Sequence, residues 1–152
     1  MKLLIGLLFA LTSLTACAQT STMEDSSAFK ELADGSCTSG QSRLVQEHIS
    51  GQITALSEED WESAYSFAAP GFQETVGLDQ FIFVITSQYQ MLINNQGVNY
   101  GACNIANQEI TQEVSVRSES EWINLSYSLS SESESLGIEA ASIVFDQPKL
   151  DI

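Results

Sequence analysis

Positive charge is the scarcest property of this sequence. Its 152 residues include five Lys and Arg against 20 Asp and Glu, which gives a formal net charge of −15. A surface of that sign repels nucleic acids and anionic headgroups, because their phosphates need Lys and Arg partners. The charge balance therefore excludes nucleic-acid binding, and solubility is enough to explain the acidity.

Residues that hold metals or cofactors are equally scarce. His48 is the only histidine, and neither a CxxC nor an HExxH motif occurs. The short acidic clusters at residues 58–60 and 132–134 lack the ligand spacing of a calcium loop. A glycine-rich phosphate loop and a serine-hydrolase elbow are also absent. We therefore expect no metal site and no cofactor.

The apolar run at the N-terminus is too short to cross a bilayer. It extends from Leu3 to Leu14, follows Lys2, and falls well below the ~20 residues that a spanning helix needs. Its length is typical of the central region of a secretory signal. The run ends in Leu-Thr-Ala-Cys at residues 14–17, which resembles the lipobox of bacterial lipoproteins.

In lipobox proteins the cysteine receives a diacylglyceryl group and the chain is cut just before it. The resemblance therefore implies a signal peptide at residues 1–16 and a lipid on Cys17. Ala18, rather than an aspartate, follows the cysteine, and the resemblance then favours the periplasmic side of the outer membrane over the inner membrane. The membrane is then a partner through the lipid anchor. Ordinary cleavage after Ala18 is the alternative.

The two other cysteines become an even pair once Cys17 is lipidated. An oxidising compartment favours a disulfide between Cys37 and Cys103. Two free thiols or a metal site are the alternatives, and a single histidine makes the metal site the poorer of them.

Residues 17–40 read as a lipidated cysteine followed by a flexible tether, because they are rich in Ser, Thr, Asp and Gly and have little hydrophobic pattern. We expect one folded domain over residues 41–152, a length that can bury a real core.

Helical periodicity begins at Ser42 and predicts three helices before residue 97. The first has its apolar face at Val45, Ile49, Gln52, Ile53 and Leu56. Ser57 reads as the N-cap of the second, which Pro70 ends; a helical turn follows, and the third helix covers residues 79–92.

Strand periodicity follows. Alternating apolar residues predict strands near 98–105, 110–116, 123–129 and 137–145. A serine-rich hairpin loop is expected at 130–135 and a bulge near 140–141. Helices followed by a meander of strands predict an α+β domain with its helices on one face of a curved antiparallel sheet.

The segment Ala-Tyr-Ser-Phe-Ala-Ala-Pro at residues 64–70 carries a further resemblance. Together with Gln52, Tyr89 and the pair Tyr100-Gly101, it resembles a bacterial family of unknown function, DUF4864. The stretch 137–143 lacks the final-strand motif usual in that family. The helix order also resembles the cone of cystatin-like and nuclear transport factor 2-like folds. The family resemblance implies a fold but no activity.

Candidate site residues follow from that cone. His48, Asp60 and Tyr65 are weak catalytic candidates, since helix capping and core packing explain them as well. The pocket candidates are Trp61, Tyr65, Phe81, Tyr89 and Tyr127.

Two functions fit these residues. The favoured one is a non-catalytic envelope lipoprotein that binds a small apolar molecule in the cone, or a protein partner on the open sheet face around Trp122. The alternative is an isomerase- or dehydratase-type enzyme. Residues 67–72 are interpreted as a helix-to-sheet packing segment, with a lip of the pocket mouth as the second interpretation.

Overall fold

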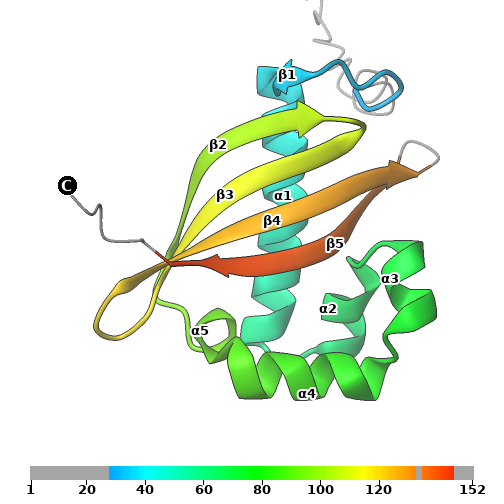
Figure 1. The fold of residues 1–152 in the computed structure, drawn as a ribbon. Coiled ribbons are helices and arrows are strands. Elements are labelled where there is room, and N and C mark those ends of the chain that lie inside the picture. Colours follow the sequence, from blue (N-terminus) through cyan, green and yellow to red (C-terminus); the bar gives the residue numbers. More distant parts are fainter. Residues whose placement is uncertain (1–27, 133–134, 146–152) are drawn as a thin grey trace, which may run out of the picture.

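One face of a five-stranded sheet carries the helices of this protein. The computed structural model describes residues 28–132 and 135–145. All strands pair antiparallel in the order β1-β2-β3-β4-β5. Figure 1 shows α1 crossing one face of the curved sheet, with α2 to α5 gathered at one end. The elements are β1 (Gly35–Ser36), α1 (Ser39–Ser57), α2 (Trp61–Ser66), α3 (Pro70–Thr75), α4 (Leu78–Gln88), α5 (Gln90–Ile93), β2 (Val98–Ala106), β3 (Glu109–Arg117), β4 (Trp122–Glu132) and β5 (Ser135–Val144). The predicted α+β class is confirmed.

Helix α1 begins at a capping box. The Thr38 hydroxyl accepts the backbone N–H of Gln41 at 3.2 Å, and the Gln41 side chain accepts that of Thr38 at 2.9 Å. All five residues of the predicted apolar face are buried, together with Gln41 and Ala55. The helical spacing thus identified the side of α1 that packs on the sheet.

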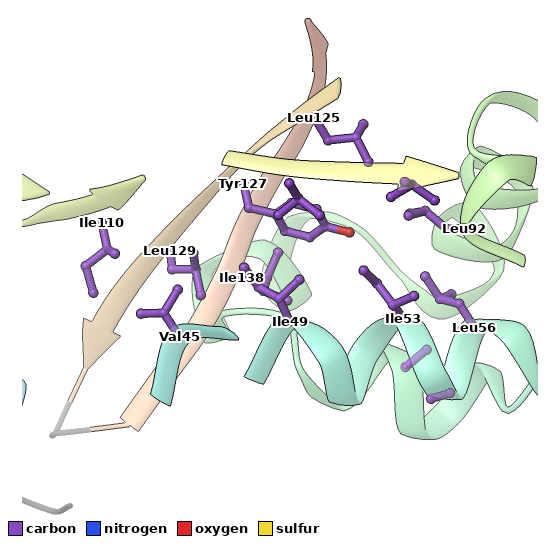
Figure 2. Packing of buried hydrophobic residues seen from close by; sticks show 14 of the residues in the cluster. Val45, Ile49, Ile53, Leu56, Leu92, Ile110, Leu125, Tyr127, Leu129 and Ile138 are labelled. Atoms are coloured by element: carbon purple, nitrogen blue, oxygen red, sulfur yellow. The ribbon is translucent and has the colours of Figure 1, made fainter. Parts of the chain in front are cut away.

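The sheet buries alternate residues against α1. Figure 2 shows Ile110, Leu129 and Tyr127 reaching from the strands toward Val45 and Ile49 of the helix, and Leu125 lying nearer to Leu92. Gln112, Val114 and Val116 are buried in the same alternation. The predicted inward face of β3 and β4 is confirmed.

Three helix boundaries differ from the prediction. Ser57 was expected to cap α2, but it is the last residue of α1, because Glu59 adopts a left-handed φ of 56° between the helices. Asp60 caps α2 instead. Pro70 was expected to end the second helix, but α2 already ends at Ser66; Pro70 instead starts α3 at the first position, where its missing N–H costs nothing. Tyr89 leaves helical geometry and divides the predicted third helix into α4 and α5.

The predicted hairpin loop at residues 130–135 is wrong in extent. Ser130 pairs with Gly137 and Ser131 with Leu136, so both strands extend into the serine-rich stretch. Backbone pairing does not depend on apolar side chains, and the sequence pattern therefore underestimated the length of β4 and β5. The bulge was predicted almost correctly, because the register shifts at Glu139 rather than at residues 140–141.

The described residues before the predicted domain boundary at residue 41 pack against the domain. Phe29 is buried, and β1 pairs with β2 through Gly35 and Ile105. Residues 28–40 are therefore part of the domain, held by core packing and strand pairing that their polar composition did not reveal. The predicted signal peptide, Cys17 and residues 18–27 lie outside the described residues. No helix in the described ranges is both long and apolar enough to span a membrane.

Candidate functional site

The segment after α2 joins the helices to the edge of the sheet. The Ala69 N–H donates to the Ile138 carbonyl, and the Ile138 N–H donates to the Phe67 carbonyl, both at 2.9 Å. A Cβ on Gly137 would lie 2.5 Å from the Ala69 Cα. Small residues are thus required on both sides of the contact, which supports the packing interpretation of residues 67–72.

His48 on α1 also contacts the segment at residues 67–69. Its Nε2 lies 3.0 Å from the Phe67 carbonyl oxygen, and its ring meets the Phe67 ring edge-on at 5.1 Å between centroids. A carbonyl can only accept, so Nε2 carries the proton. Burial lowers the pKa of the imidazole below its ordinary value. His48 therefore fastens α1 to the segment after α2.

Tyr65 joins α2 to α3. Its hydroxyl donates to the Val76 carbonyl at 2.6 Å and lies 3.2 Å from that of Gln73. The Gln73 side chain in turn donates to the Ala68 carbonyl at 2.9 Å. The Tyr65 hydroxyl is therefore already engaged in holding the two helices together.

Asp60 is an exposed helix cap. Its carboxylate accepts the Ser63 N–H at 3.2 Å and the Ser63 hydroxyl at 2.7 Å, and these bonds lower its pKa. Within the described ranges, His48, Asp60 and Tyr65 each bond to a different partner and not to one another. The structure does not assemble the three catalytic candidates into one site. Nor does any group of three or more His, Cys, Asp or Glu in the described chain have the geometry to hold a metal ion.

A cavity of about 240 Å³ lies between α3, α4 and β5. Of the five predicted pocket residues, Phe81, Tyr89 and Tyr127 line it, whereas Trp61 and Tyr65 do not. The other lining residues are Gln52, Ala68, Phe72, Val76, Gln80, Val84, Ile85, Leu92, Ile138, Glu139, Ala140 and Ala141. Most of this surface is apolar, and 12 of its 15 lining residues were not among the predicted pocket residues.

The cavity wall is fixed where α4 ends. The Tyr89 hydroxyl donates to the Ala141 carbonyl of β5 at 2.6 Å. This bond links the break between α4 and α5 to the edge strand. The departure of Tyr89 from helical geometry is therefore what positions its side chain against the sheet.

Two buried polar side chains face the inner end of the cavity. Gln52, 5% exposed, lies on α1, and its Nε2 is 3.4 Å from the Ala64 carbonyl. Tyr127 on β4 is fully buried, and its hydroxyl has no hydrogen-bond partner. Burial raises the pKa of that hydroxyl far above its ordinary range, so it stays protonated. Gln80 and Glu139 are exposed and form the mouth.

The predicted disulfide is present near the opposite edge of the sheet, at β2. Cys37 and Cys103 are bonded across 66 residues of sequence, with their Cα atoms 5.4 Å apart. The backbone N–H of Cys37 also donates to the Cys103 carbonyl at 3.0 Å. The bond fastens the segment between β1 and α1 to the sheet.

Trp122 lies away from the cavity, at the start of β4. It is 43% exposed, and the Arg117 guanidinium lies 5.6 Å from its ring centroid. Val144 and Phe145 at the end of β5 are also exposed. This end of the sheet thus presents apolar side chains to solvent.

Comparison with known proteins identifies the family. No curated protein and no solved structure matches this chain, and the resemblance to the nuclear transport factor 2-like cone stays a prediction. The model of a domain of unknown function, DUF4864, matches residues 38–149. That match spans α1 to β5, which includes the joint at residues 67–69 and every residue that lines the cavity. The chain therefore belongs to the DUF4864 family.

Proposed function

We propose that this protein is a non-catalytic binding module of the cell envelope that holds a small, mostly apolar molecule in the cavity between α4 and β5. The cavity itself carries the proposal. A cavity of ~150 Å³ lined by apolar side chains is large enough for benzene, and this one has a volume of about 240 Å³. Concave, mostly apolar sites with a few convergent polar groups are typical of ligand pockets.

The hydrogen bonds around the cavity favour a preformed site. Tyr89 bonds to Ala141 on one side, and Ala69 bonds to Ile138 on another. These bonds hold the helical wall and the edge strand at a fixed spacing. A molecule that enters a preformed cavity orders few additional side chains, and binding then loses little free energy to conformational entropy.

The placement of the catalytic candidates favours binding over catalysis. An isomerase or dehydratase needs an acid or base that reaches the bound molecule. His48 and Asp60 do not line the cavity, and the Tyr65 hydroxyl bonds to Val76. The Tyr127 hydroxyl does face the cavity region, but its raised pKa makes it a poor proton donor and keeps it from acting as a base.

The disulfide supports the envelope location. Structural disulfides persist in oxidising compartments such as the bacterial periplasm, and Cys37–Cys103 is one. We infer that residues 1–16 direct export and that a lipid on Cys17 anchors the domain to the membrane. A Cys17→Ser variant should leave the membrane fraction when cells are broken, whereas the parent protein should stay in it.

Ligand binding is tested by calorimetric titration with 2-acetylnaphthalene, a neutral and mostly apolar probe. Ala141→Leu adds a side chain to the cavity wall and should abolish the binding. Ser142→Leu is the matched control, because residue 142 is on the opposite face of β5 and does not line the cavity. Equal binding by the two variants would contradict the proposed site.

A further inference from the structure

The polar groups of the cavity are divided between its two ends. At the inner end, Gln52 and Tyr127 come from α1 and β4 and are almost completely buried. At the mouth, Gln80 and Glu139 are exposed. A ligand in this cavity therefore has apolar walls along its length and meets buried polar groups only at its inner end.

The Tyr127 hydroxyl is the polar group that lacks a partner. Figure 2 shows its ring between the sheet and α1, with the oxygen directed toward Leu92, which also lines the cavity. A buried hydroxyl without a hydrogen bond is unfavourable, because it gave up its bonds to water on folding. Since Tyr127 has no exposed surface, a small shift of the side chains around it is needed for a ligand oxygen to reach the hydroxyl.

Charge limits which ligand oxygen can bind there. No Lys, Arg or His is among the described residues that line the cavity, and Glu139 places a carboxylate at the mouth. An anionic group moved to the inner end would lose its hydration without gaining a cation as partner. A neutral oxygen needs only the hydrogen bond that Tyr127 can donate.

We propose that the cavity selects uncharged ligands, with a carbonyl or ether oxygen that accepts a hydrogen bond from the Tyr127 hydroxyl, and that it rejects carboxylates such as fatty acids. This inference rests on the proposed function, because it specifies the chemistry of the molecule that the same cavity holds. It assigns Tyr127 the role of choosing the ligand's polar group, while the apolar wall accepts its body.

Three probes of nearly equal shape separate the effects of the hydrogen bond, the charge and the apolar contacts on affinity. They are 2-acetylnaphthalene, the hydrocarbon 2-isopropenylnaphthalene, which replaces the ketone oxygen with CH₂, and the anion 2-naphthoate. Titrations at high salt screen the long-range repulsion from the net charge, so that differences report on the cavity. The parent protein should bind the ketone at least tenfold more tightly than the carboxylate.

The Tyr127→Phe variant tests the hydrogen bond. It removes one oxygen that has no partner in the protein, so the fold should be retained, and a melting curve checks this. Affinity for the ketone should fall about five- to tenfold, the range expected for one hydrogen bond, and affinity for the hydrocarbon should not fall. Tyr100→Phe is the control, because Tyr100 does not line the cavity; it should leave both affinities unchanged.

The outcomes distinguish the two proposals. If ketone and hydrocarbon bind the parent protein but Tyr127→Phe weakens neither or both alike, the role of Tyr127 is overturned and the apolar site stands. Binding of the carboxylate as tight as that of the ketone would overturn the selection against anions. If none of the three probes binds the parent protein, the proposed function is overturned together with this inference.

Discussion

Helices α1 and α4 lie on the same side of the sheet but use their apolar residues differently. Helix α1 buries seven residues along its 19, and its side chains fill the space below β3 and β4. Helix α4 buries only Phe81 and Ile85 of its 11 residues, while Phe83 is 69% exposed. The space between α4 and β5 stays open as the cavity.

The difference has a physical cause in the spacing of the apolar residues. In α1 they follow one face with helical period, so that a single surface contacts the sheet. In α4 the consecutive residues 81–85 are all apolar, and they point around much of the helix. We therefore expect the part of the molecule around α1 to contribute most of the stability, and the part around α4 to hold the proposed ligand.

We expect the largest loss of stability from a substitution between α1 and the sheet, where side chains fill the space. Ile49 is fully buried between α1 and the sheet, so Ile49→Ala should lower the free energy of unfolding by about 4 kcal/mol. Val84→Ala, at the cavity wall, removes a half-buried side chain and should cost less than about 1 kcal/mol. Urea denaturation measures both. Losses of equal size would show that the two parts do not differ.

Removal of the disulfide should cause the second largest loss of stability. Replacing Cys37 and Cys103 together by serine releases a constraint across 66 residues, and we expect a loss of about 3 kcal/mol. Reduction of the parent protein with dithiothreitol should produce the same loss, which controls for effects of the serines. If neither treatment lowers the denaturation midpoint, the bond does not constrain the unfolded chain.

A substitution at the contact between residues 67–69 and β5 should have a smaller effect on stability. Gly137→Ala would place a Cβ 2.5 Å from the Ala69 Cα, and the backbone shift that relieves this contact should cost about 2 kcal/mol. Gly71→Ala is the matched control, because its Cβ would meet open space in α3. That substitution should be neutral or stabilising. A melting temperature unchanged in Gly137→Ala would contradict the close contact.

The smallest effect concerns His48. Burial lowers its pKa in the folded protein below the unfolded value of ~6.5, so the unfolded chain binds more protons as the pH falls. The stability associated with neutral His48 is thus fully present above about pH 6.5 and is lost below it. Relative to His48→Gln, the parent protein should lose up to about 1 kcal/mol between pH 7.5 and pH 5. A stability difference that stays constant with pH would contradict this account.

Periodicity predicted the fold more completely than the site. The helical spacing of apolar residues in α1 and their alternation in β3 and β4 can be read from the sequence, because the buried side of each element is mostly apolar. The left-handed turn at Glu59 and the pairing of Ser130 and Ser131 arise from backbone geometry. Side-chain pattern does not record such features.

The cavity shows the same limit. Phe81, Tyr89 and Tyr127 were predictable as large inward residues. Ala141 and Glu139 enter the lining only because β5 passes the end of α4, a tertiary arrangement. Gln52 was predicted to lie on the buried face of α1, but its place beside the cavity depends on how α1 crosses the sheet.

The most direct test of the central claim is native mass spectrometry of the protein released gently from the envelope of its own host. The account predicts a discrete added mass that is lost on denaturation, belongs to a neutral and mostly apolar molecule, and is absent from the Ala141→Leu variant. A bare protein mass, or an added mass retained equally by Ala141→Leu, would contradict a ligand in the cavity between α4 and β5.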